Sequence, residues 1–114
     1  MKILIANRGE IAIRIARSIR ELGYIPLGIY TEQDSNSLHR IYMDEDIRVS
    51  SYLDIDDILK AAEELGADAI HPGYGFLSEN PGFARSVVDK GFIFIGPPPE
   101  IMEIAGDKIG AKAK

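Results

Sequence analysis

Cysteine is absent from this sequence of 114 residues, and histidine is scarce. Without cysteine, disulfide frameworks, thiolate nucleophiles and cysteine-ligated metal sites are all excluded. The two histidines, His39 and His71, lie too far apart in the chain to form a recognisable metal-binding spacing. We therefore expect no metal site in this chain, and the lack of cysteine is compatible with a cytoplasmic protein.

The chain also has fewer positively than negatively charged residues, and its apolar runs are short. The 13 Lys and Arg residues are outnumbered by 18 Asp and Glu residues, so the formal net charge is -5. Because contacts with phosphate backbones need clustered Lys and Arg, this balance argues against nucleic acid as the main partner. The first apolar run, "ILIA" at 3–6, is too short for a signal-peptide core or a membrane span. We therefore expect no membrane contact.

The length and composition are typical of one globular domain. Apolar residues make up 46% of the chain and charged residues 27%, which predicts a packed interior. Domains commonly contain roughly 100–150 residues, so the chain is too short for two ordinary domains. We expect a single domain over 1–114.

Short β-rich segments alternate with segments of helical spacing. Strands are predicted at "KILIA" (2–6), "IPLGIY" (25–30), "IRVS" (47–50), "ADAIHP" (67–72) and "FIFIG" (92–96). These strands are continuous apolar runs, as expected for strands that helices cover on both faces. The sequence therefore predicts an α/β fold with a doubly wound, mainly parallel sheet of about five strands.

The first predicted helix runs from Gly9 to Leu22. Its apolar stripe consists of Ile11, Ile15, Ile19 and Leu22. Ile13 falls outside this stripe, so we expect the helix to bury a second surface, which includes Ile13, against something that the chain does not contain.

Two further helices have clear start and stop signals. The helix at 54–66 has Asp54 as its N-cap and Gly66 as its left-handed stop. The next begins at Asn80 and Pro81 and ends at Gly91. Its predicted buried residues are Phe83, Ala84, Val87 and Val88. A short helix at 99–105 and another that begins near Asp107 are also predicted.

Ligands of doubly wound sheets bind beyond the carboxyl ends of the strands. The first of these turns lacks the glycine-rich dinucleotide fingerprint, since "ANRGEIAIRI" contains one glycine and then Glu10, which would repel a phosphate. An ordinary dehydrogenase is therefore not expected. Without any function, Asn7 would be a turn residue and Arg8 a surface charge. Glu10 would be an acid in the first turn of the helix, where it interacts favourably with the helix dipole.

The stretch "HPGYGFLSEN" at 71–80 contains more than a turn requires. Gly73 and Gly75 give Tyr74 backbone freedom, so its phenol could be presented at the edge of the sheet. The residues alone favour the alternative of a packed aromatic ring. His71 is interpreted as a strand-end imidazole that the backbone satisfies, and Asn80 as a helix cap. Spacing alone assigns no role to Lys108.

Three stretches, "ILIANRGEIAIRIARSIRELG" (3–23), "HPGYGFLSENPGFA" (71–84) and "GFIFIGPPPEIMEIAGDK" (91–108), occur in an order and spacing that resemble the N-terminal domain of biotin carboxylase. "IANRGEIA" and "HPGYGFLSEN" are highly specific to this family, whereas related ATP-grasp enzymes carry a segment like "GDK". The resemblance covers nearly the whole chain. It implies a Rossmann-like pre-ATP-grasp domain over 1–114, with the ATP-grasp and C-terminal domains absent from this chain.

The resemblance implies ATP-dependent carboxylation of biotin. In this family, bicarbonate is activated by MgATP as carboxyphosphate, and the carboxyl group passes to biotin on a carrier protein. The implied partners are the biotin carboxyl carrier protein, a carboxyltransferase, the remainder of the biotin carboxylase chain and a second copy in a homodimer. The acyl acceptor is chosen elsewhere, so the sequence leaves acetyl-CoA, propionyl-CoA and pyruvate open.

Five positions carry family roles by resemblance. Lys108 of "GDK" matches the lysine that contacts ATP, as an ammonium near polyphosphate can. Tyr74, with Gly75, matches the tyrosine beside the biotin ureido ring. Arg17 and Glu21 match positions that pair across the homodimer interface. No catalytic residue is assigned to this chain, since the Mg-binding acids, the glycine-rich lid and the general base of the family lie outside it. We expect the chain alone to be inert and to bind no cofactor tightly.

The sequence departs from the family pattern at one segment, and two other classes of function compete with this interpretation. The segment "RVSSYLDID" is shorter than its family counterpart, which puts contacts made there in doubt. A free-standing α/β module that binds CoA or a nucleotide would have Tyr74 in its core and Lys108 on its surface. A receiver-like signalling domain is disfavoured, because the acids of "TEQD" and "DED" do not follow the first and third strands as a phosphoacceptor site requires.

Overall fold

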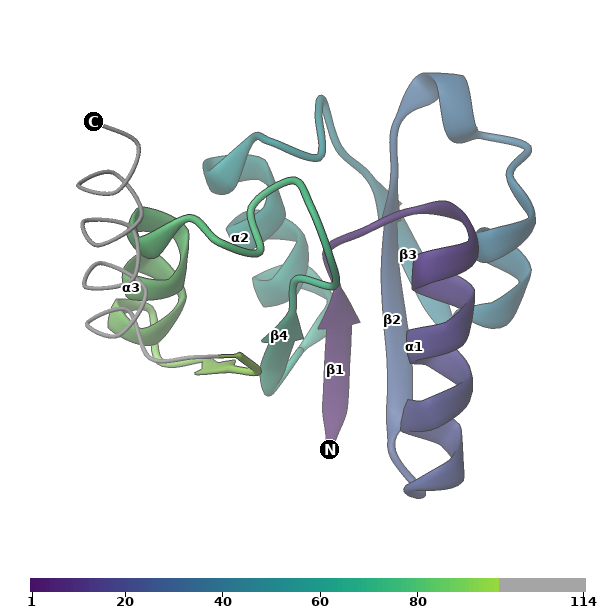
Figure 1. Cartoon of the computed structure of the whole chain (residues 1–114), viewed down its shortest axis with the longest axis horizontal. Helices are drawn as coiled ribbons and strands as arrows, with labels where there is room; N and C mark the ends of the chain where they lie inside the picture. The colour runs from purple at the N-terminus through teal and green to yellow at the C-terminus, as the bar shows by residue number, and fades with distance from the viewer. Residues whose placement is uncertain (97–114) are drawn as a thin grey trace, which may run out of the picture.

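The computed structural model describes residues 1–96. The helices predicted at 99–105 and from Asp107, and Lys108 with them, lie outside the described residues. The described chain forms one sheet and three helices, with two short 3₁₀ turns between the second and third strands (Figure 1).

The sheet contains five strands in the order β3-β2-β1-β4-β5. Every neighbouring pair is parallel. The strands are β1 (Lys2–Ile5), β2 (Ile25–Tyr30), β3 (Glu45–Arg48), β4 (Ala69–His71) and β5 (Ile93–Phe94). The predicted doubly wound parallel sheet is therefore confirmed, although β3 begins two residues earlier than predicted and both β4 and β5 are shorter.

The helices begin and end where the sequence signals place them. They are α1 (Gly9–Glu21), α2 (Ile55–Leu65) and α3 (Pro81–Asp89). The Asp54 carboxylate accepts the Asp57 N–H at 3.1 Å, and the Asn80 side chain accepts the Phe83 N–H at 3.0 Å. Gly66 ends α2 in the left-handed conformation. Both predicted N-caps and the predicted stop are confirmed.

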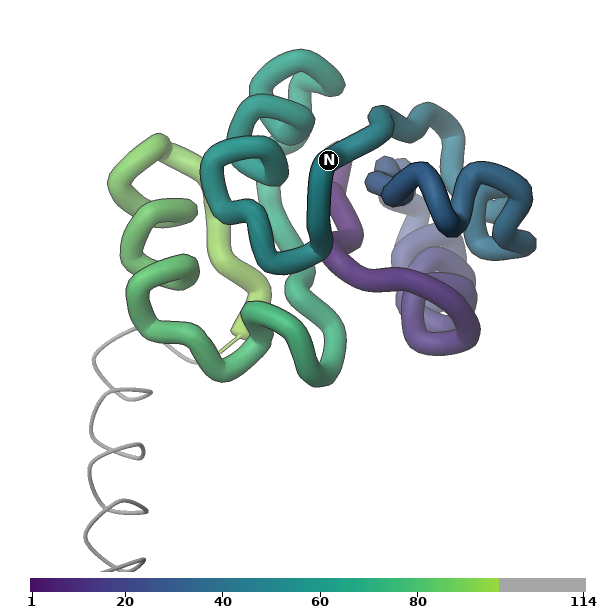
Figure 2. The backbone as a smooth tube through the Cα atoms, turned by 90° about the horizontal axis from the view of Figure 1, so that it is seen from above, coloured from purple at the N-terminus to yellow at the C-terminus, as the bar shows by residue number. Residues whose placement is uncertain are grey.

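Alternate residues of β1 face opposite layers of the molecule. Leu4 belongs to the larger core cluster, with the buried faces of α2 and α3. Ile3 and Ile5 belong to a second cluster, with the buried face of α1. Figures 1 and 2 show α1 on one side of the sheet and α2 on the other. The sheet is thus covered on both faces, as continuous apolar strands require.

Three predictions about helix faces were wrong. Ile13 is buried within this chain, because α1 also packs against the 3₁₀ helix η2 (Leu38–Tyr42), which the sequence did not predict. Leu22 is 70% exposed, since it lies just beyond the last residue of α1. Val88 is 51% exposed, because the buried side of α3 is already occupied by Phe83, Ala84 and Val87.

Candidate functional site

The candidate site lies where the parallel strands end, at the upper edge of the sheet in Figure 1. Tyr74 lies in the loop that follows β4, and its side chain is exposed, with a relative accessibility of 73%. Gly73 and Gly75 on either side have φ angles of 69° and 71°, which glycine adopts without strain. The presented phenol that the resemblance implied is confirmed, and the packed aromatic ring that the residues alone favoured is wrong.

Asn7 ties this loop to the turn after β1. Its amide nitrogen donates to the Pro72 carbonyl at 2.9 Å and to the Tyr74 carbonyl at 2.7 Å. Its Oδ1 accepts the Arg8 N–H at 2.8 Å. The side chain is almost completely buried, with 1% of the residue exposed. Sequence reasoning treated Asn7 as a turn residue and missed this role, because the two carbonyls come from a distant segment.

Gly73 packs directly on Asn7. A Cβ atom at Gly73 would lie 2.7 Å from the Asn7 amide nitrogen and 3.1 Å from its Cβ and Cγ. Real Cβ atoms do not approach other heavy atoms that closely, so a larger residue would displace the amide. Both the positive φ and the close approach therefore require glycine at this position.

His71, at the end of β4, accepts the Gly73 N–H on Nδ1 at 3.0 Å. This bond confirms the prediction that the backbone satisfies the imidazole. With Nδ1 as an acceptor, the proton of the neutral ring is on Nε2. Burial lowers the pKa of His71 below its ordinary value, so the ring is neutral at pH 7.

Arg8 joins the turn after β1 to the segment after β2. Its Nε and Nη2 donate to the two carboxylate oxygens of Asp34 at 2.5 and 2.6 Å. The Tyr52 hydroxyl donates to the same carboxylate at 2.7 Å. Asp34 is buried, and the bond from Arg8 holds the pKa of its carboxyl well below its usual range. Burial and the bond to Asp34 raise the pKa of Tyr52 to about 12.

Phe76 connects this ionic group to the loop that carries Tyr74. Its ring centroid lies 5.2 Å from that of Tyr52. Phe76 has a φ of 47°, in the left-handed region that few large residues adopt. Phe76 follows Gly75, so the strained backbone and the ring contact with Tyr52 occur at the same residue. The loop is therefore held at two points, by Asn7 through its backbone and by Tyr52 through a side chain.

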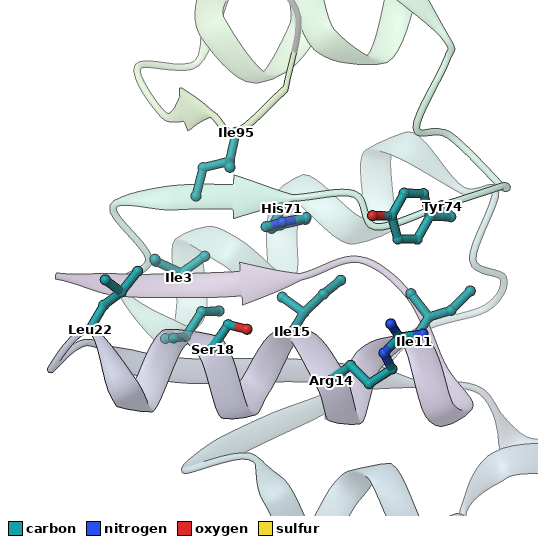
Figure 3. Close-up of a pocket in the computed structure, with 10 residues that line it drawn as sticks. Ile3, Ile11, Arg14, Ile15, Ser18, Leu22, His71, Tyr74 and Ile95 are labelled. Carbon is teal, nitrogen blue, oxygen red and sulfur yellow. The ribbon is translucent and has the colours of Figure 1, made fainter.

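A pocket of about 390 Å³ opens beside Tyr74, between α1 and the strands β1 and β4 (Figure 3). Most of its lining is apolar, including Ile3, Ile11 and Ile15. Its polar lining comes from Arg14, Ser18, His71 and Tyr74. In Figure 3 the Tyr74 hydroxyl lies on the side of the ring that faces His71. The phenol therefore stands at the mouth of a largely apolar hollow with a few polar groups, as is usual for small-molecule sites.

The other predicted site residues lie away from this pocket or outside the described chain. Arg17 and Glu21 are exposed on α1, and the Arg17 guanidinium lies 5.5 Å from the centroid of the Tyr42 ring. Lys108 lies outside residues 1–96. Within those residues, no three His, Asp or Glu side chains form a group that could hold a metal ion. The helices of the described region are also too short or too polar to cross a membrane.

Comparison with known proteins identifies a family. Residues 1–102 match the family model of the biotin carboxylase N-terminal domain. The chain is 50% identical to a biotin carboxylase of Halalkalibacterium halodurans, over 97% of this chain and 26% of that protein. It is 49% identical to the mitochondrial pyruvate carboxylase of Rattus norvegicus, over 98% of this chain and 10% of that protein.

A solved structure gives the same answer for the fold. The biotin carboxylase domain dimer of the Hydrogenobacter thermophilus 2-oxoglutarate carboxylase matches with a TM-score of 0.86 and 46% identity, over 90% of this chain and 24% of that chain. That structure is a complex with MgADP, ADP and bicarbonate. The chain thus spans about a tenth to a quarter of the length of the relatives it matches.

Proposed function

Because the chain belongs to the family of biotin carboxylase N-terminal domains, we propose that it forms the first part of a biotin carboxylase. That enzyme is the ligase that carboxylates carrier-bound biotin with bicarbonate and MgATP through carboxyphosphate. In this proposal the chain works with an ATP-grasp domain and a C-terminal domain that lie outside it. Alone it is catalytically inert.

The observation that carries this proposal is the presented phenol of Tyr74. The residue is exposed at the carboxyl edge of the sheet, and its backbone carbonyl is anchored to the buried Asn7. A phenol hydroxyl both donates and accepts hydrogen bonds, so it can bind the carbonyl or N–H of a ureido ring. We assign Tyr74, with Gly75 as its flexible neighbour, to the wall of the biotin site.

We assign nucleotide binding to residues that do not lie at the carboxyl edge of the sheet. Glu10 stands in the first turn of α1, where its negative charge opposes a phosphate, and residues 1–96 hold no metal-binding group. By the family resemblance, we assign ATP to Lys108 together with the rest of the enzyme, and Mg²⁺ to that remainder. Arg17 and Glu21 are proposed to pair with a second copy in a homodimer. The carrier protein and carboxyltransferase are the further partners.

The test is a chimera in which residues 1–114 replace the matching segment of the Halalkalibacterium halodurans biotin carboxylase. We expect the chimera to hydrolyse ATP in a manner that depends on bicarbonate and biotin. Tyr74→Phe in the chimera should raise KM for biotin about fivefold, the effect of losing a hydrogen bond of about 1 kcal/mol. Tyr24→Phe is the matched control, because Tyr24 precedes β2 at the opposite edge of the sheet. Unchanged KM and kcat in Tyr74→Phe would sink the assignment of Tyr74.

A calorimetric titration separates this function from a self-sufficient nucleotide module. We expect the chain of 114 residues to bind MgATP weakly or undetectably, because Lys108 lacks its partners. Micromolar affinity in the same titration would favour the nucleotide module instead.

A further inference from the structure

We propose that Asn7 is the positioning residue of Tyr74: its two amide bonds set the direction of the turn that presents the phenol. This inference deepens the proposed function and rests on it for the role of Tyr74. The placement of the turn by Asn7 concerns only the chain itself.

Two hydrogen bonds from one side chain restrain a turn more than either bond alone. The Pro72 carbonyl belongs to the peptide unit before Gly73, the residue with the positive φ, and the Tyr74 carbonyl belongs to the peptide unit after Tyr74. A single bond would leave the turn free to rotate about the bonded atom. Because the same amide nitrogen holds both carbonyls, it restrains the backbone of Gly73 and Tyr74, the two residues that lie between the bonded carbonyls, and so fixes the direction in which the Tyr74 side chain leaves the turn.

The anchor itself is rigid. Ile5 and His71 are paired in the sheet, and the Ala6 N–H continues the ladder to the His71 carbonyl at 2.8 Å. Asn7 is the next residue, so its backbone begins where the ladder ends. Its Oδ1 also accepts the Arg8 N–H, which orients the carboxamide with its donors toward the loop. A side chain buried to this extent has little rotational freedom.

The chemistry of the site requires an uncharged donor group. Both partners are carbonyl oxygens, so a carboxylate of the same shape would face them without a proton. Asn7→Asp therefore removes the anchor while leaving the volume unchanged. Asn80 provides a matched control in the same segment. Its side chain acts as an acceptor from the Phe83 N–H, so Asn80→Asp keeps the bond and adds the same charge.

The first measurement is amide hydrogen exchange in the chain of 114 residues. In Asn7→Asp, exchange of the Gly73 amide, which is bonded to His71, should accelerate by roughly tenfold more than exchange of the Ile70 amide in β4. Asn80→Asp should show no such difference. If exchange of the Gly73 amide in Asn7→Asp accelerates no more than exchange of the Ile70 amide, Asn7 does not hold the turn and the proposal is wrong. Should Asn7→Asp fail to fold, Asn7→Ser supplies the same test, since its short hydroxyl cannot reach both carbonyls.

The second measurement uses the chimera. Asn7→Asp should raise KM for biotin by up to about fivefold, the effect expected for Tyr74→Phe, with a much smaller change in kcat, because a displaced phenol weakens binding of this substrate. A purely structural defect would instead lower kcat through loss of active enzyme and leave KM unchanged. A loosened turn with unchanged KM overturns the positioning role if Tyr74→Phe does raise KM. If Tyr74→Phe is silent as well, the proposed function of Tyr74 fails, while the exchange data still decide whether Asn7 holds the turn.

Discussion

The core beneath α2 and α3 and the polar carboxyl edge of the sheet are stabilised by different forces. The core consists of buried apolar side chains such as Leu4, Ile70 and Phe83, which contribute through burial without directional bonds. At the edge, Asn7 and Asp34 are also buried but are held by short hydrogen bonds with defined partners. Burial at the core thus determines whether the domain folds, whereas directional bonds at the edge determine where Tyr74 lies.

The largest effect is expected from Phe83→Ala in the core. Phe83 is fully buried, and its ring meets that of Phe94 edge-on at 6.0 Å between centroids. Truncation should lower the free energy of unfolding by about 3–5 kcal/mol. Chemical denaturation measures this loss, and Val88→Ala is the control on the same helix, with an expected change within about 0.5 kcal/mol. Equal effects of the two substitutions would contradict the burial assigned to α3.

Asp34→Asn should have the next largest effect and should change the response to acid. The Arg8 side chain is 48% exposed, so water can compensate part of the lost ion pair, and we expect a loss of about 2 kcal/mol at neutral pH. Because the pKa of Asp34 is lower in the folded than in the unfolded state, its stabilisation is complete above the unfolded pKa of about 4. It is then lost progressively as the pH falls through the folded pKa.

Urea unfolding at a series of pH values from neutral to strongly acidic checks this expectation. The stability of the unmodified chain should fall more steeply below about pH 4 than that of Asp34→Asn. Parallel pH profiles for the two chains would show that the ion pair contributes nothing to acid sensitivity.

Gly73→Ala tests the close approach at the edge. An alanine at either Gly73 or Gly75 must adopt a positive φ. At Gly73 its Cβ would also collide with the Asn7 amide, whereas at Gly75 no atom lies within 4 Å of the Cβ position. Gly75→Ala should therefore cost about 1 kcal/mol from backbone strain, and Gly73→Ala about 1 kcal/mol more. Thermal unfolding of both variants gives the difference. Equal losses would mean that Asn7 yields without cost and does not brace the turn.

The smallest effect is expected from Tyr52→Phe, which removes one hydroxyl. The bond to Asp34 should contribute about 1 kcal/mol near neutral pH. The pKa of Tyr52 is raised to about 12, so its hydroxyl stabilises the fold fully below the unfolded pKa of about 10 and loses this effect as the pH rises toward 12. Stability measured between about pH 10 and pH 12 should decline less in Tyr52→Phe. A steeper decline in the variant would contradict the assigned bond.

Local patterns in the sequence predicted most of the fold. The caps at Asp54 and Asn80 and the stop at Gly66 each depend on residues within a few positions, and all three were confirmed. The burial of Ile13 within this chain, rather than against something outside it, was not predicted, since it depends on η2, a turn with no strong sequence signal. At the candidate site, the glycines around Tyr74 allowed a presented phenol but only the family resemblance favoured it, and nothing local indicated what holds the loop.

Local sequence patterns were sufficient for the succession of strands and helices along the chain, because it depends on periodicity and capping, whereas the exposure of Tyr74 was expected only from the family resemblance. The tertiary structure alone decided that Asn7 meets the Tyr74 loop and that Arg8 meets Asp34. The physical reason is the strand order, in which β1 lies between β2 and β4. Two consecutive residues after β1 can therefore reach in opposite directions, one to the loop after β4 and the other to the segment after β2.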